Sequence, residues 1–144
     1  MSQTHPNPTS QITVIDDDVE LLKLMVLLLR RVGAQPTTIA NGQEALDYLE
    51  AHIPDLIILD LMLPGVNGFD ILRHIRSDPR FDVVPVLVLS AKVDPQTIRA
   101  VLDAGADGYV TKPYIANSFI DRVRLLLTAG RQVAPSDEPP ISPT

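Results

Sequence analysis

The chain has 144 residues, of which 45% are hydrophobic and 21% charged, a mixture typical of one globular domain rather than of a disordered chain. It contains no cysteine, which excludes a disulfide framework and a thiolate metal site. A formal net charge of −6, with twelve scattered lysines and arginines, argues against direct nucleic-acid binding, and no apolar run is long enough to span a membrane.

Proline placement separates two tails from a central domain. Six of the thirteen prolines lie in residues 1–10 and 135–144, where apolar periodicity is absent. We therefore expect a flexible N-terminal tail over residues 1–10, one folded domain over 11–129, and a flexible Pro-rich tail or linker over 130–144. The polar start of the chain carries no signal-peptide pattern, so we expect a cytoplasmic protein.

Within the domain, short apolar runs alternate with longer helical patterns. The strands are expected at residues 12–15, 35–39, 55–59, 86–89 and 108–110. The helices are expected at residues 19–31, 42–51, 68–77, 95–104 and 115–129. The third and fourth strands are apolar at every position, which is typical of strands covered on both faces. The pattern predicts an α/β fold, a three-layer sandwich around a doubly wound parallel sheet of five strands in the order 2-1-3-4-5.

Polar side chains follow four of the five expected strands at the point where each strand ends. These residues are Asp16, Asp17 and Asp18 after the first strand, Asp60 after the third, Ser90 after the fourth and Lys112 after the fifth. Open α/β sheets bind ligands outside the carboxyl ends of their strands, where the strand order reverses. The second strand has no reactive residue after it and is an edge strand in the expected order. We therefore expect the polar residues to meet in one crevice.

The charges in this crevice do not balance. Three carboxylates, on Asp16, Asp17 and Asp60, face the single ammonium group of Lys112, which leaves a local charge of about −2. A hard divalent cation with oxygen ligands relieves such repulsion, and Mg²⁺ suits the site, with Mn²⁺ as an alternative ion. The other interpretation is that the aspartates only cap the helices that follow them, and we favour it for Asp18 alone.

The chain resembles the receiver domains of two-component response regulators, the CheY-like family. The resemblance lies in four stretches and in their spacing: ITVIDDD (12–18), DLIILDLMLPGVNG (55–68), PVLVLSAK (85–92) and GADGYVTKPY (105–114). It implies a flavodoxin-like fold and a phosphoprotein that acts in phosphorelay signal transduction. It also implies that the domain catalyses only its own phosphorylation and dephosphorylation and is not otherwise an enzyme.

The resemblance implies a role for each residue of the crevice. Asp60 would be the phosphoacceptor and would form an acyl phosphate with a phosphoryl group from a histidine kinase or a phosphotransfer protein. Asp16, Asp17 and Asp60 would hold Mg²⁺ together with the backbone carbonyl of Met62. Lys112 would pair with an oxygen of the phosphoryl group.

The resemblance also implies a switch. The Ser90 hydroxyl would swing toward the phosphoryl group, and Tyr109 would turn inward to fill the space behind it. This movement would alter the face made by the fourth helix, the fifth strand and the fifth helix. Through that face the domain would control a downstream effector or its own output domain, or form a homodimer. The other interpretation of Tyr109 is an ordinary half-exposed strand tyrosine.

Two enzyme or cofactor classes compete with this interpretation. An aspartyl phosphatase on a similar sheet would carry an acid/base aspartate two residues after its nucleophile, but Met62 cannot transfer protons. A flavin-binding protein would need a phosphate loop after the first strand, where the run Asp16–Asp17–Asp18 would repel the phosphate. Within the signalling class, we favour a stand-alone receiver. The alternative is the receiver part of a longer regulator, such as a DNA-binding transcription factor.

The first expected helix carries more apolar residues than one buried face requires. They are Leu21, Leu22, Leu24, Met25, Val26, Leu27, Leu28 and Leu29. One interpretation is burial between neighbouring helices. The other is that part of the band stays exposed and docks the helical bundle of a histidine kinase, because exposed apolar patches tend to mark interfaces.

Overall fold

The computed structural model describes residues 9–91, 94–112 and 116–131, and these form a parallel sheet of five strands. The strands are β1 (Ser10–Ile15), β2 (Ala34–Ile39), β3 (Leu56–Asp60), β4 (Val86–Ser90) and β5 (Gly108–Thr111). They lie in the order β2-β1-β3-β4-β5, which confirms the expected topology and places β2 at an edge. Pro36 is accommodated inside β2 because an edge strand can lack one ladder hydrogen bond.

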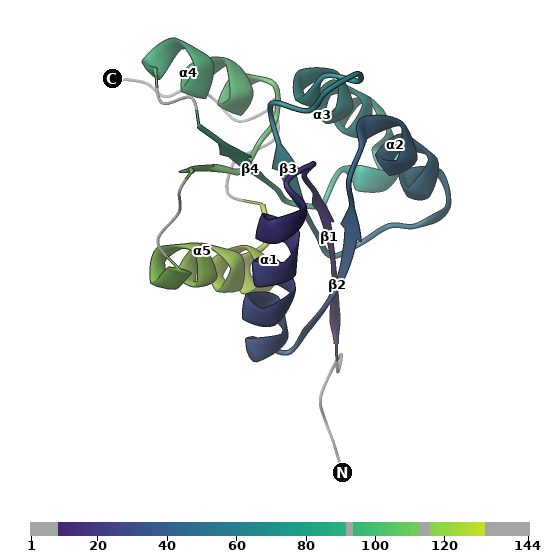
Figure 1. Cartoon of the computed structure of the whole chain (residues 1–144). Helices are drawn as coiled ribbons and strands as arrows, with labels where there is room; N and C mark the ends of the chain where they lie inside the picture. The colour runs from purple at the N-terminus through teal and green to yellow at the C-terminus, as the bar shows by residue number, and fades with distance from the viewer. Residues whose placement is uncertain (1–8, 92–93, 113–115, 132–144) are drawn as a thin grey trace.

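Helices cover both faces of the sheet (Figure 1). On one face lie α1 (Val19–Arg31) and α5 (Ala116–Ala129). On the other lie α2 (Gly42–Ala51), α3 (Gly68–Ser77) and α4 (Pro95–Asp103). The result is the three-layer sandwich that the alternation of strand and helix patterns predicts. A short 3-10 helix, η1 (Pro79–Phe81), was not anticipated.

Local side chains decide where the first three helices begin. The side chains of Asp18, Asn41 and Asn67 each accept a hydrogen bond from a backbone N–H in the first turn of the following helix, at 3.1, 2.8 and 2.7 Å. Each bond satisfies a donor that the helix itself leaves unpaired. All three helices begin and end where the sequence predicts. The expectation that Asp18 caps a helix is also confirmed.

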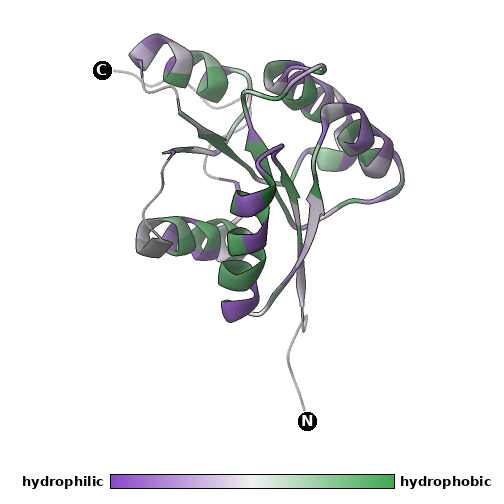
Figure 2. Ribbon diagram, viewed as in Figure 1, coloured by the Kyte–Doolittle hydropathy of each residue, from purple (hydrophilic) through white to green (hydrophobic). Residues whose placement is uncertain are grey.

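The apolar side chains divide into two clusters, one on each face of the sheet. Every residue of β3 and β4 is buried, as expected for central strands covered on both faces. Figure 2 shows these strands as largely hydrophobic, with hydrophilic residues on the helices. Within the described residues, no helix combines the length and apolar character needed to cross a membrane.

A buried cluster of charged side chains lies at the end of the sheet where the strands begin. We call Asp107, Arg76 and Arg131 the Asp107 cluster. The Asp107 carboxylate lies 3.0 Å from Nη2 of Arg76 and 3.0 Å from Nε of Arg131, and its side chain has no exposed surface. It also accepts the N–H of Val86, the first residue of β4. The cluster therefore ties the start of β4 to α3 and to the chain just beyond α5.

Candidate functional site

The polar residues expected to share a site meet at the carboxyl ends of β1, β3 and β5. Asp16 and Asp17 directly follow β1, Asp60 ends β3, and Lys112 follows β5. One carboxylate oxygen from each of Asp16, Asp17 and Asp60 lies within 4.8 Å of the other two. The structure thus brings together side chains that are far apart in the sequence.

Lys112 bridges the two buried carboxylates. Its Nζ lies 2.8 Å from Oδ2 of Asp16 and 3.4 Å from Oδ2 of Asp60. The side chains of Asp16 and Asp60 are 0% and 5% exposed, whereas that of Lys112 is 22% exposed and Asp17 faces solvent. One cation therefore faces three carboxylates, two of which are shielded from water.

The environment shifts the proton affinities of this group. Burial raises the pKa of Asp16, and the charge of Asp60 raises it further, although the ion pair with Lys112 opposes both effects. Burial by itself would lower the pKa of Lys112, but its contacts with Asp16 and Asp60 outweigh burial and raise it. Lys112 is therefore a permanent cation at neutral pH, and Asp16 carries its charge at a cost.

Backbone N–H groups orient the two buried carboxylates. The N–H of Asp18 donates to Oδ1 of Asp16 at 2.9 Å, and the N–H of Met62 donates to Oδ1 of Asp60 at 3.1 Å. The contact between the Met62 N–H and Asp60 was not predicted from the sequence. The signal was present, because a side-chain oxygen of aspartate commonly accepts from the backbone two residues later.

The donor set fits a small, hard divalent cation. Asp16, Asp17 and Asp60 supply carboxylate oxygens, the ligand type that Mg²⁺ prefers. Although Lys112 lies close to Oδ2 of Asp16, this buried oxygen accepts no well-directed hydrogen bond from the described residues. A buried oxygen without such a bond has capacity for a metal ligand. The site is open to solvent at Asp17, which is exposed.

Ser90 and Tyr109 lie on the neighbouring strands β4 and β5, toward the end of the sheet that carries the carboxylates. Ser90 ends β4 and is completely buried, and its carbonyl accepts the N–H of Lys112 at 2.9 Å. Tyr109 lies on β5, half-buried, and packs against the core on the α2–α3–α4 face. In the register of β4 and β5, Tyr109 pairs with Val88, two residues before Ser90. Tyr109 and Ser90 therefore lie on neighbouring strands, offset by two residues in the register.

The apolar band of α1 is only partly buried. Leu22, Met25, Leu28 and Leu29 are buried. By contrast, Leu24 and Leu27 are 46% and 61% exposed. Burial therefore explains half of the band and leaves exposed leucines on the outer surface of α1.

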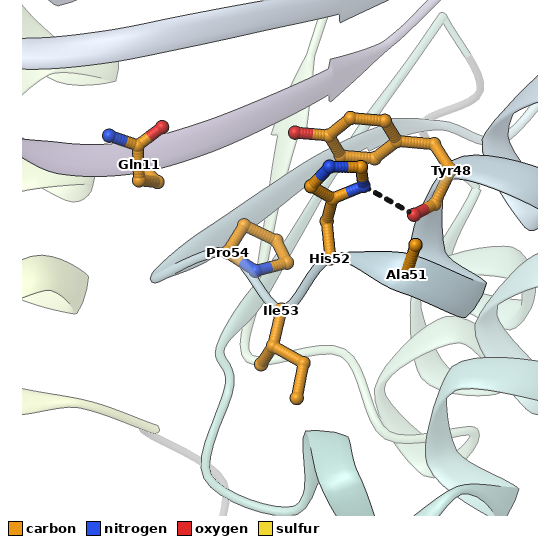
Figure 3. Close-up of a pocket in the computed structure, with 6 residues that line it drawn as sticks. All are labelled: Gln11, Tyr48, Ala51, His52, Ile53 and Pro54. Carbon is orange, nitrogen blue, oxygen red and sulfur yellow. Dashed lines mark hydrogen bonds between the residues drawn. The ribbon is translucent and has the colours of Figure 1, made fainter.

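A pocket of about 350 Å³ lies beside the start of β1, away from the carboxylates. Figure 3 shows the rings of Tyr48 and His52 face to face in it, with centroids 4.0 Å apart. Its lining residues are Gln11, Tyr48, Ala51, His52, Ile53 and Pro54. They include one histidine but no carboxylate, lysine or arginine.

Known proteins with the same features are response regulators. Residues 12–124 match the family model described as "Response regulator receiver domain". The chain is 39% identical over 117 residues to the DNA-binding response regulator MtrA of Mycobacterium tuberculosis, covering 81% of this chain and 50% of that protein. It is 37% identical over 119 residues to the transcriptional regulatory protein BaeR of Escherichia coli, covering 83% and 48%. The chain thus spans about half the length of the curated relatives it matches.

Solved structures of response regulators have the same fold as this chain. The receiver domain of the Francisella response regulator 1452 superposes with a TM-score of 0.78 at 28% identity, covering 84% of this chain and 98% of that one. Receiver domains bind Mg²⁺ at an acidic pocket, and this structure contains a cluster of three aspartates. This chain belongs to the receiver-domain family of two-component response regulators.

Proposed function

We propose that Asp60 of this receiver domain accepts a phosphoryl group from a phosphohistidine, and that Mg²⁺ assists the transfer. The observation that supports this proposal is the meeting of three carboxylates and Lys112 at one end of the sheet. The Asp60 carboxylate contacts both Lys112 and the N–H of Met62. This carboxylate is therefore held in one orientation, as a nucleophile requires.

In the proposed reaction, a carboxylate oxygen of Asp60 attacks the phosphorus atom. The phosphorus–nitrogen bond of the donor breaks, its electron pair goes to the imidazole ring, and an acyl phosphate forms on Asp60. Asp16, Asp17, Asp60 and the carbonyl of Met62 would hold the ion, Mg²⁺ or alternatively Mn²⁺. When bound, the ion neutralises charge on the transferring group.

Lys112 and Ser90 are proposed to hold the phosphorylated state. Lys112 contacts Asp16 and Asp60 in this structure, and its ammonium group can pair instead with a phosphoryl oxygen. The Ser90 hydroxyl would donate to a second phosphoryl oxygen, and Tyr109 would turn into the space that Ser90 leaves. This movement would bias the face of α4, β5 and α5 between two states.

Incubation with acetyl phosphate and Mg²⁺ tests the phosphoacceptor. The wild-type protein should gain one phosphoryl group, as intact mass spectrometry would show, and chelation of Mg²⁺ should prevent the gain. The Asp60→Asn variant should gain none, because an amide cannot form the acyl phosphate. A suitable control is Asp70→Asn, since Asp70 is exposed in the first turn of α3 and should not affect the reaction. Phosphorylation that persists in Asp60→Asn would place the acceptor elsewhere.

We further propose that the exposed leucines of α1 dock the helical bundle of a histidine kinase. Replacement of Leu24 and Leu27 by glutamate should slow transfer from a phosphorylated histidine kinase on the order of tenfold, because interface leucines lose their apolar contacts. Phosphorylation by acetyl phosphate should not change, since that donor needs no docking. The measurement is the transfer rate from the most active member of a panel of phosphorylated kinases.

The matched control for this surface is Val83→Glu. Val83 is 79% exposed in the loop before β4. This loop lies at the end of the sheet where the strands begin, far from the phosphoacceptor. Replacement of Val83 adds one negative charge to an exposed apolar position, half the charge change of the double α1 variant, and should leave kinase transfer unchanged. Equal rates for the wild type and the α1 variant would remove α1 from the docking surface.

A third proposal concerns the output. MtrA and BaeR are named as DNA-binding and transcriptional regulators, and this chain spans about half of each. This supports the alternative that the domain is the receiver part of a longer DNA-binding regulator. The proposed contact with an effector, an output domain or a second copy is the face of α4, β5 and α5.

A further inference from the structure

We propose that Gly42, the first residue of α2, is a positioning residue for the phosphorylation site. It would act through Val66 on the loop of residues 61–67, which joins β3 to α3 and carries Met62. This inference rests on the proposed function, because it concerns the same Mg²⁺ and phosphoacceptor site. It adds a residue that lies on a different strand–helix connection and contacts neither the ion nor the phosphoryl group.

Gly42 is placed where no side chain fits. It is buried, and a Cβ atom at this position would lie 2.6 Å from Cβ of Val66, 3.0 Å from the carbonyl oxygen of Val66 and 3.2 Å from Cδ1 of Ile71. The first distance is too short for two carbon atoms, so Val66 would have to move. The backbone of Gly42 is not in the left-handed region, so space and not conformation requires glycine here.

Val66 is the contact between Gly42 and the loop. Its side chain is half-buried and packs against the core on the α2–α3–α4 face, as does the buried Leu63. Together with the buried Leu61, whose N–H donates to the carbonyl of Leu89, these residues hold the loop to the protein body, while Met62 is 54% exposed. The position of Met62 is therefore determined by how the loop is anchored.

The other end of the loop leaves it little freedom to absorb a displacement. The N–H of Gly68 donates to the carbonyl of Leu61 at 3.2 Å. A Cβ at Gly68 would lie 2.5 Å from that same carbonyl oxygen and 2.7 Å from the carbonyl oxygen of Asp60. The loop thus packs against two glycines, Gly42 and Gly68, that have no side chain to move aside. A displacement of Val66 should therefore also displace Met62, whose N–H orients Oδ1 of Asp60.

Backbone geometry does not require glycine at position 42, the first residue of α2, because its φ is not in the left-handed region. An alanine there would therefore suit α2 if space allowed. A purely local effect of Gly42→Ala would therefore leave the metal site untouched. Displacement of the loop should instead weaken Mg²⁺ binding and disturb the Met62 amide.

The test compares the full chain with Gly42→Ala in two measurements. By calorimetric titration, the variant should bind Mg²⁺ about tenfold more weakly than the wild type, the loss typical of a disturbed residue beside a metal ligand. In the metal-free protein, the NMR signal of the Met62 amide should shift, because its hydrogen bond to Asp60 changes. The neighbouring control Gln43→Ala should change neither, since Gln43 is exposed and bonds only to Asp47 among the residues described.

The same substitution made in the Val66→Gly variant shows whether Val66 transmits the effect of Gly42→Ala to the metal site. In Val66→Gly the obstructing side chain is absent, so adding Gly42→Ala should cause little further loss of Mg²⁺ affinity and little further shift of the Met62 amide. If Gly42→Ala does not fold by itself, the double variant should fold and bind Mg²⁺ as Val66→Gly does. An unchanged Met62 amide in Gly42→Ala, or an equal loss in both backgrounds, would overturn the inference. A wild-type protein that binds no Mg²⁺ would overturn the proposed function instead, and the amide signal would still test Gly42.

Discussion

Replacement of Asp17 by alanine should weaken Mg²⁺ binding at least about 100-fold, because loss of a metal ligand should cost more than the 10- to 100-fold typical of outer-shell partners. Asp17 contributes one of the three clustered carboxylates and faces solvent. Because exposed substitutions typically change the free energy of unfolding by no more than about 0.5 kcal/mol, the metal-free variant should be about as stable as the wild type. Titration calorimetry and urea denaturation measure the two quantities.

The adjacent Asp18 provides a control with the opposite result. Its side chain caps α1 through the N–H of Leu21 and takes no part in the carboxylate cluster. Asp18→Ala should therefore lower the free energy of unfolding by about 1 kcal/mol and leave Mg²⁺ affinity nearly unchanged. Its backbone N–H, which donates to Asp16, is retained in the variant. Wild-type affinity in Asp17→Ala would exclude Asp17 as a ligand. Equal losses in both variants would mean that the aspartate run acts only through its overall charge.

Replacement of Asp107 by alanine should lower the free energy of unfolding by about 3–5 kcal/mol, the usual cost of removing one partner from a buried ion pair. The variant would leave the guanidinium groups of Arg76 and Arg131 facing each other without their shared carboxylate. Burial already lowers the pKa of Arg76 to about 10, and the charge of Arg131 adds to this effect. The N–H of Val86 would also lose an acceptor.

Urea denaturation of the Asp107→Ala variant measures this loss. Asp103→Ala is the matched control, because Asp103 is exposed at the end of α4 and its replacement should cost no more than about 0.5 kcal/mol. While folded, Asp107→Ala should still accept a phosphoryl group from acetyl phosphate, since the Asp107 cluster lies at the opposite end of the strands from Asp60. A loss below about 1 kcal/mol would mean that water or a shift of the arginines compensates for the missing carboxylate.

Sequence patterns predicted most of the fold because their signals are local. Helix periodicity and capping residues such as Asn41 act within a few positions, and the bounds of α1, α2 and α3 agree with the prediction. Strand ends were less well placed. β1 begins two residues earlier than expected and β3 ends one residue later, at Asp60 itself. Pairing with neighbouring strands decides where a strand ends, and the sequence of one strand does not contain that information.

The members of the carboxylate cluster could also be predicted, since parallel strands must present their carboxyl ends at one edge of the sheet. The bridging position of Lys112 and the contact between the Met62 N–H and Asp60 needed coordinates. The exposed side of α1 also needed coordinates, because periodicity identifies the apolar residues of a helix but not which of them a neighbouring element covers.

The sequence by itself determined the order of strands and helices, the helix caps and the identity of the acidic residues at the strand ends, because these depend on short-range geometry and on topology. Only the tertiary structure decided which distant groups share a site. Arg76 and Arg131 lie 31 and 24 positions from Asp107, and Gly42 and Val66 belong to different connections. No local spacing relates such pairs, because their contacts arise only when the helices pack against the sheet.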